Sequence, residues 1–213
     1  EENITTGLGV QTPKSADAAH IALLGGLLRP NELLDATNNK TYIHHALVLD
    51  VPCVADGKTT PGIPSSVYPA LYSNGSTIPS DACHDSSIGD GPPYGSLLAL
   101  NMTDQQIAAT NSPGWEQTIM KTIAHYGAYV SDTQSTELLS IFRQSCESWA
   151  SLGVPDIFQN VDQQLAASSG GTYYFSSDCS HFPTSANYGL KSTFAIPVNQ
   201  LEVIDPCIPK HIC

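Results

Sequence analysis

Asp132 is the first candidate for chemistry in this chain of 213 residues, because it follows the apolar, β-prone run 128–130. An acid at the end of a core strand is positioned by the scaffold and can still face a cleft. Cleavage of a glycosidic bond needs a carboxyl group that protonates the leaving oxygen. We therefore select Asp132 as a candidate general acid. The same position also suits an acid that opens a turn or caps a following helix.

A second titratable group is expected beside such an acid. Inverting hydrolysis, for example, needs a base roughly 6.5–9.5 Å away to activate water. Asp50, Asp85 and Asp90 are the acidic candidates. Asp90 is favoured because its Gly-Asp-Gly setting indicates an exposed loop, whereas Asp50 could instead close a strand.

His45 is the alternative partner, either as the base or as the group that orients Asp132. His44 and His45 are adjacent in a predicted strand, so their side chains should leave on opposite faces. One is expected to face the core or a cleft and the other solvent. The competing interpretation of His45 is a core histidine with satisfied hydrogen bonds.

Three tyrosines lie in a segment, 55–96, that holds much of the Gly, Pro, Ser and Asp of the chain. A stretch of this length indicates a functional loop region with short strands. Tyrosine rings can stack on sugar faces, although each could equally be an ordinary half-buried side chain. We select them as candidate substrate-binding residues: Tyr68, Tyr72 and Tyr94.

Other catalytic classes are poorly represented. The His, Asp and Cys residues have no local metal-ligand spacing, and neither a G-x-S-x-G elbow nor a phosphate loop is present. We therefore predict no metal and no cofactor. A net charge of −12 argues against nucleic acid and anionic membrane surfaces, since both need basic patches. Neutral polysaccharides remain as substrates.

The cysteines and the glycosylation sequons both indicate secretion. No apolar run is long enough to span a bilayer, and Glu1 is interpreted as a processed N-terminus. An acidic, Ser/Thr-rich chain suggests an oxidising compartment and a eukaryotic, by composition fungal, source. We expect disulfides, in pairings that the sequence leaves open, among Cys53, Cys83, Cys146, Cys179, Cys207 and Cys213. Attached N-glycans are expected at Asn3, Asn39, Asn74 and Asn101.

Periodicity predicts one α+β domain over residues 19–213 after an N-terminal arm, 1–18. In the helix expected over 112–126, Trp115, Ile119, Ile123 and Tyr126 share a face, and Gly127 suits a left-handed terminus. The elements suggest a mainly antiparallel sheet or small β-barrel with three to four helices, stabilised by disulfides. One or two helical turns are expected at 29–34, a short helix that opens with the capping box 103–106, and further helices at 136–152 and 155–167. Strands are expected at 42–54, 96–100, 128–130, 172–175, 193–198 and 201–204.

The order of several short motifs resembles a group of secreted bacterial proteins without an assigned activity. The motifs are, in order, His45-Ala46-Leu47, Tyr68-Pro69-Ala70, Ser73-Asn74-Gly75, Pro93 to Leu100 and Tyr126 to Asp132. The resemblance covers most of 20–132 and the last strands. It departs at Asn74, where the group has Asp, and 133–192 and all six cysteines have no counterpart.

Two of these segments also resemble paired strands of double-psi β-barrels, as in lytic transglycosylases, expansins and family 45 endoglucanases. There an Asp after the second strand acts on a glycosidic bond, which implies the same role for Asp132. The sequence therefore predicts a secreted enzyme that cleaves a neutral polysaccharide, with Asp132 as proton donor and Asp90 or His45 as its partner. The alternatives are a non-catalytic carbohydrate- or cell-wall-binding protein and a secreted effector or inhibitor that binds a protein.

Overall fold

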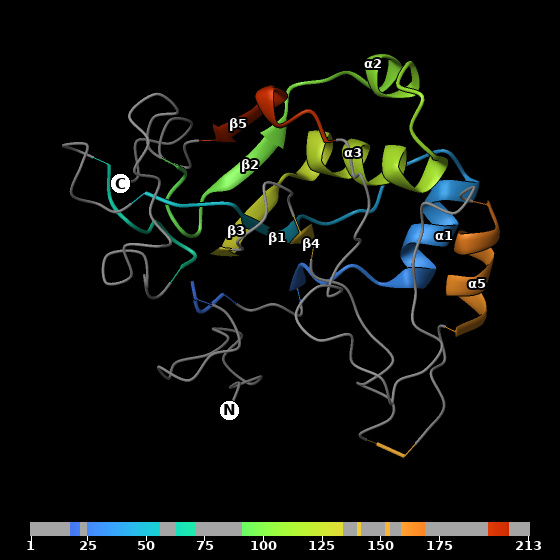
Figure 1. Cartoon of the computed structure of the whole chain (residues 1–213), viewed down its shortest axis with the longest axis horizontal. Helices are drawn as coiled ribbons and strands as arrows, with labels where there is room; N and C mark the ends of the chain where they lie inside the picture. The colour runs from blue at the N-terminus through green and yellow to red at the C-terminus, as the bar shows by residue number, and fades with distance from the viewer. Residues whose placement is uncertain are drawn as a thin grey trace.

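The computed structural model describes residues 18–21, 25–55, 63–70, 91–133, 140–141, 152–153, 159–168 and 196–204 (Figure 1). Nearly all of the predicted N-terminal arm, the predicted strand 172–175 and most of the 55–96 loop region lie outside these residues. Within them, four helices and five strands form an α+β fold.

The sheet is open and mixed, with strand order β4-β1-β3-β2-β5. β1 and β3 are parallel, whereas β4–β1, β3–β2 and β2–β5 are antiparallel. The edge strands are not paired with each other in the described chain, so the predicted barrel is wrong. The predicted mainly antiparallel sheet is confirmed, except that its central pair, β1 and β3, is parallel. The strands are β1 (Leu47–Val51), β2 (Leu97–Leu100), β3 (Ala128–Thr133), the two-residue β4 (Ser140–Ile141) and β5 (Leu201–Ile204).

The predicted strand–helix–strand order of the central region is confirmed. α3 (Gly114–Tyr126) follows Pro113, whose missing N–H costs nothing at a helix start. Trp115, Ile119 and Ile123 are buried, as predicted, and α3 packs on β2 and on α1. Tyr126 is 39% exposed, so its predicted inward position is wrong.

Gly127 turns the chain directly from α3 into β3. Its φ of 76° has the predicted sign, but its ψ of −176° places it outside the left-handed helical region. This combination of φ and ψ is found essentially only in glycine. A Cβ here would lie 2.6 Å from Leu97 Cδ1 and 2.9 Å from the Leu98 carbonyl oxygen. The tight turn lets β3 lie between β1 and β2.

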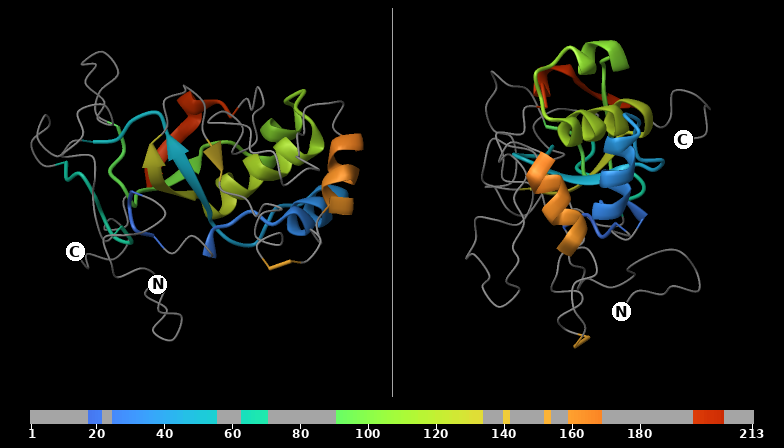
Figure 2. Two further views of the ribbon diagram at one scale, coloured as in Figure 1. Left: turned by 60° about the horizontal axis from the view of Figure 1, so that its bottom comes forward. Right: turned by 90° about the vertical axis from the view of Figure 1, so that its right-hand side faces the viewer.

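Three more helices join α3: α1 and α5 lie side by side at one end of the molecule, and α2 lies beside α3 (Figure 2). α1 (Pro30–Asn38) extends beyond the predicted turns at 29–34, and Leu33 and Ala36 face inward. α2 (Asp104–Ala108) begins with the predicted capping box of Thr103 and Gln106. α5 (Gln159–Ser168) overlaps the predicted 155–167 region and packs against α1.

Two predicted elements are wrong. Residues 140–141 form β4 beside β1, so a continuous helix over 136–152 does not exist. Residues 196–197 are irregular and 198–200 form a 3₁₀ turn, so a strand does not extend over 193–198. Pairing with the sheet overrode the helical periodicity of the first segment, because strand formation depends on neighbours that the local sequence does not specify.

Candidate functional site

The parallel strands β1 and β3 bring two acids together at their carboxyl ends. Cα pairing runs from Leu47↔Ala128 to Val51↔Thr133, and in this ladder Asp50 lies opposite Asp132. Both side chains are half-buried. We call Asp50 and Asp132 the carboxylate pair. Of the acidic partners proposed for Asp132, Asp50 is therefore the one that the described residues place beside it.

An irregularity in the ladder sets the position of this pair. The register shifts between Leu49 and Asp50, so Ser131 and Asp132 together oppose Asp50. Ser131 Oγ donates to Asp50 Oδ1 at 3.4 Å, which is a long contact. Bulges of this kind redirect side chains and are over-represented next to active sites.

The backbone around the pair is held by several hydrogen bonds. Asp132 Oδ1 accepts the N–H of Thr133 at 2.8 Å, and the Ser131 carbonyl accepts the N–H of Ala19 at 2.9 Å. On the neighbouring side, Gly95 N–H donates to the Val130 carbonyl at 2.8 Å. Asp132 is thus part of β3 itself, and its interpretation as a turn-opening or helix-capping residue stays open, because residues 134–139 lie outside the described chain.

The separation of the carboxyl groups follows from strand geometry. Neighbouring strands lie about 4.7–4.9 Å apart. Two carboxyl groups on paired residues can therefore reach the ~5–5.5 Å typical of retaining glycosidases, rather than the wider spacing of inverting ones. Like charges on adjacent strands destabilise a sheet, and such costs are common at functional sites.

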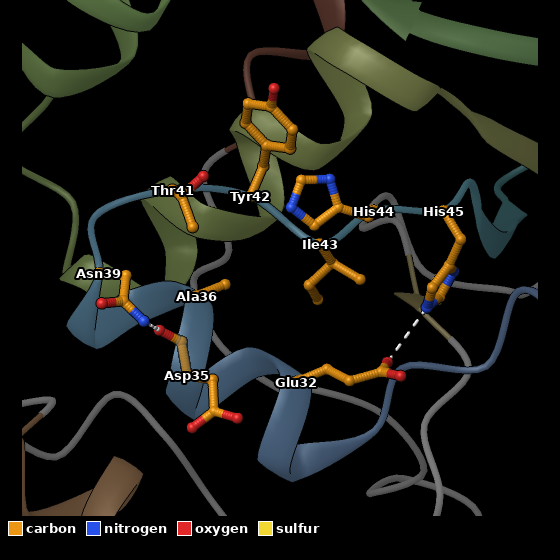
Figure 3. Close-up of a pocket in the computed structure, with 9 residues that line it drawn as sticks. All are labelled: Glu32, Asp35, Ala36, Asn39, Thr41, Tyr42, Ile43, His44 and His45. Atoms are coloured by element: carbon orange, nitrogen blue, oxygen red, sulfur yellow. Dashed lines mark hydrogen bonds and ion pairs between the residues drawn. The ribbon is translucent and has the colours of Figure 1, made fainter.

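His45 lies at the opposite end of β1. Four residues, 46–49, lie between it and Asp50, and three of them belong to β1, which makes the path on the order of 15 Å. The structure therefore does not bring His45 to Asp132, and neither role proposed for it, as base or as orienting group, is supported by the geometry. The strand predicted over 42–54 is confirmed only as β1, Leu47–Val51, and both histidines lie in the bend before it, where His44 is exposed and His45 is half-buried (Figure 3).

Both ring nitrogens of His45 face acceptors. Nε2 is 3.1 Å from Glu32 Oε2 and Nδ1 is 2.9 Å from the Ala46 carbonyl oxygen. Both contacts are hydrogen bonds only when the ring carries two protons, since carboxylate and carbonyl oxygens can only accept. Arg29 Nη1 donates to the other Glu32 oxygen at 3.0 Å. His45 therefore links the segment before β1 to Glu32 of α1.

A groove of about 490 Å³ runs between α1 and the extended segment 41–45 (Figure 3). Ala36 and Ile43 are apolar and buried, and they lie in its middle. Glu32 and His45 mark one end of the groove, and Asp35 and Asn39 mark the other. Thr41, Tyr42 and His44 complete its lining. We call this the α1 groove.

Four aromatic and imidazole rings gather on the surface beside the groove. Tyr42 stacks on His125 with centroids 4.1 Å apart, and His44 meets Tyr42 edge-on at 5.2 Å. Tyr126 lies 5.9 Å from Tyr42, and its hydroxyl is 3.3 Å from His44 Nδ1. His125 also pairs with Asp104 at 2.9 Å. We call Tyr42, His44, His125 and Tyr126 the ring cluster.

The tyrosines proposed from the sequence have different outcomes. Tyr94 is fully buried in the core, so its ring cannot stack on a sugar and that prediction is wrong. Its burial follows from the short parallel bridge that places it beside Ser66. Tyr68 is 78% exposed, which leaves its predicted role open. Tyr72 lies outside the described residues.

Several other predicted residues also lie outside the described part of the chain: Asp85, Asp90, Asn3, Asn74, Cys83, Cys146, Cys179, Cys207 and Cys213. Cys53 is described and half-buried, and the predicted disulfides stay a prediction. Asn39 and Asn101 are exposed, as glycosylation requires. Within the described ranges, no three His, Cys, Asp or Glu side chains could together hold a metal ion.

The sequence did contain a signal for the carboxylate pair. Asp50 follows the apolar run Leu47–Leu49, just as Asp132 follows the run 128–130. Two strand-then-acid patterns meet at one edge when the strands are parallel neighbours. The ring cluster carried no such signal, because its two halves, Tyr42 with His44 and His125 with Tyr126, lie about eighty residues apart in the sequence.

Comparisons with family models, with curated proteins and with solved structures found no match to this chain. Among the described residues, no helix has both the length and the apolar character needed to cross a bilayer. The resemblance to secreted bacterial proteins therefore stays a prediction, and function rests on the geometry.

Proposed function

We propose that this protein is a secreted enzyme that hydrolyses glycosidic bonds of a neutral polysaccharide, with Asp50 and Asp132 as its two catalytic carboxyl groups. The observation that carries the proposal is the register of the parallel strands, which places Asp50 opposite Asp132. Two neighbouring carboxyl groups are the minimal machinery of most glycoside hydrolases.

The two acids take different roles in this proposal. The Thr133 N–H donates to Asp132, and donation to a carboxylate favours its charged form. We assign Asp132 as the nucleophile that attacks the anomeric carbon while Asp50 protonates the departing oxygen. Water then cleaves the resulting ester and returns its proton to Asp50. These roles reverse the sequence-based prediction, in which Asp132 was the proton donor.

The net charge supports a neutral substrate. With 20 acidic and 8 basic residues, the chain would repel an acidic polymer unless basic groups gathered locally. The carboxylate pair itself adds negative charge at the proposed site. A neutral glycan avoids this repulsion.

The test is hydrolysis of a panel of neutral polysaccharides by the wild-type protein and by Asp50→Asn and Asp132→Asn. We expect reducing ends from at least one polymer, loss of about 10³-fold in kcat in each variant, and retained anomeric configuration by NMR. Glu202→Gln, an exposed acid on β5, serves as a matched control that keeps full activity. Undiminished cleavage by Asp132→Asn would refute the assignment.

Azide separates the roles of the two acids. In Asp132→Ala, azide should restore turnover and give a glycosyl azide of inverted configuration, because a small anion can replace a missing nucleophile. In Asp50→Ala, azide should restore turnover only for substrates with good leaving groups. Rescue in the opposite pattern would exchange the two assignments.

The ring cluster supports a second candidate function, non-catalytic carbohydrate binding. Its four rings combine exposed apolar faces with polar edges, which suits the alternating surface of a sugar. Retention of an insoluble polysaccharide without cleavage, lost in His44→Ala, would favour this function. If the protein neither retains nor cleaves any polysaccharide, that result would favour the third function, a protein-binding effector.

A further inference from the structure

The α1 groove contains a glycosylation sequon. Asn39, Lys40 and Thr41 form the sequence Asn-x-Thr, and both Asn39 and Thr41 line the groove. Asn39 is exposed at its end, while Ala36 and Ile43 form an apolar middle (Figure 3). A sugar attached at Asn39 would therefore start at the rim of a cavity of about 490 Å³.

The sequon is held in a fixed turn. The Asn39 N–H donates to the Asp35 carbonyl, the Lys40 N–H to Thr37 and the Thr41 N–H to Ala36. Lys40 has a φ of 54°, which ends α1 in a left-handed conformation. This turn fixes the Asn39 side chain relative to the groove.

We propose that Asn39 carries an N-linked glycan whose first N-acetylglucosamine lies in the α1 groove. In the linking reaction, Asn39 Nδ2 loses a proton and bonds to C1 of the sugar. The bond from C1 to the pyrophosphate of a lipid-linked oligosaccharide donor breaks, and the lipid pyrophosphate leaves. The inference rests on passage of the chain through a secretory pathway, which is part of the proposed function.

The groove matches this occupant chemically. Asn39 Nδ2 donates to the Asp35 carbonyl at 2.9 Å, and a glycosylated amide keeps one N–H for this bond. The apolar floor suits the methyl group and C–H face of N-acetylglucosamine, while Asp35 and Glu32 offer acceptors for its hydroxyl groups. The volume is within the ~300–1,000 Å³ range of small-molecule sites.

Covalent attachment makes weak contacts sufficient. A tethered sugar meets the groove at a high effective concentration, so no free-ligand affinity is needed. Asn101 is the natural comparison, since it is also an exposed sequon asparagine. Its Nδ2 donates to Glu202 Oε1 at 2.7 Å, and it does not line the α1 groove.

The experiment is site-specific mass spectrometry of the full chain secreted from an N-glycosylating yeast. Glycan at Asn39 is expected in the wild type and in Thr41→Ser, which keeps the sequon, and no glycan in Thr41→Val. Should Thr41→Val fold poorly, Asn39→Gln removes the same site without changing Thr41. Absence of glycan at Asn39 in the folded, secreted wild type would overturn the proposal.

Docking is tested by endoglycosidase release under native conditions. The glycan at Asn39 should be released at least ~10-fold more slowly than from denatured protein, which corresponds to about 1.4 kcal/mol of docking. Any glycan at Asn101 should show no such protection. Equal release from native and denatured protein would overturn seating in the groove. Neither result depends on Asp50 or Asp132, so failure here is distinct from failure of the catalytic proposal.

Discussion

The two ends of β1 differ in the kinds of titratable side chains that meet there. At its amino end, His45 Nε2 faces Glu32 Oε2 at 3.1 Å, which is an opposite-charge pair when the ring carries both protons, and Arg29 contacts the second Glu32 oxygen. At its carboxyl end, Asp50 and Asp132 place two acids of the same charge on neighbouring strands. β1 therefore has a contact between an imidazole and a carboxylate at one end and two neighbouring carboxyl groups at the other.

This difference separates a structural titratable group from a candidate catalytic one. Both ring nitrogens of His45 lie within hydrogen-bond distance of protein oxygens, and neither faces the carboxylate pair. The carboxylate pair instead places two acids on directly paired residues of neighbouring strands. Substitutions at the two ends should therefore affect different properties.

The largest expected effect is on catalysis at the carboxyl end. Asp50→Asn and Asp132→Asn should each lower kcat about 10³-fold, or about 4 kcal/mol in activation free energy. Because Asn keeps the size of Asp and an oxygen that accepts hydrogen bonds, the melting temperature should change little. Calorimetry of the two variants checks the second expectation. A fall in melting temperature that accounts for the lost activity would make the pair structural.

Gly127→Ala should damage both ends, because this residue sets β3 beside β1 and its carbonyl accepts the Leu47 N–H. The backbone conformation alone should cost about 1–3 kcal/mol of unfolding free energy, and the contact with Leu97 adds to it. Urea unfolding measures the change. Gly25→Ala is the matched control, since a Cβ there has nothing within 4 Å. Equal stability of the two variants would contradict the strain argument.

His45→Gln should cost about 1 kcal/mol of unfolding free energy, the usual size of a partly exposed charged contact. It should leave kcat unchanged, since His45 lies on the order of 15 Å from the carboxylate pair along the strand. Denaturant unfolding and steady-state kinetics report these separately. A loss of kcat comparable to that of Asp132→Asn would restore His45 as a catalytic base.

Glu116→Gln should change the free energy of unfolding least, and the size of this change should depend on pH. Burial on α3 raises the pKa of Glu116 above its ordinary 4.5, and the hydrogen bond with Ser112 partly offsets this. The native state therefore loses stability as pH rises from 4.5 through the raised pKa, because the buried carboxyl resists ionisation. Gln should stabilise the protein at pH 7 and not at pH 4, as thermal unfolding would show. An equal change in thermal stability at pH 4 and pH 7 would contradict the proposed destabilisation by the ionised Glu116 carboxyl.

Local patterns predicted the central elements correctly. The capping box at Thr103 began α2 as expected, and the spacing of Trp115, Ile119 and Ile123 identified α3. These features depend on contacts within one or two turns. Tyr126 shared the same periodicity yet lies at the surface, since only the packing of α3 decides where its buried face ends.

The candidate site was predicted only in part. Asp132 and Asp50 were both selected from the sequence, but Asp90 and His45 were preferred as partners. The helix expected over 136–152 is replaced at 140–141 by β4, which pairs with Asp50 through Ser140. Strand order decided these outcomes, and strand order depends on contacts between residues about eighty positions apart.

The sequence by itself determined which residues could carry chemistry and which segments could be helical, because residue type, capping and helical periodicity are local properties. Only the tertiary structure decided which of those residues meet. The parallel register of β1 and β3 placed Asp50 beside Asp132 and left His45 at the far end. A shift of one residue in that register would pair different side chains, so proximity is a property of the assembled sheet rather than of any segment.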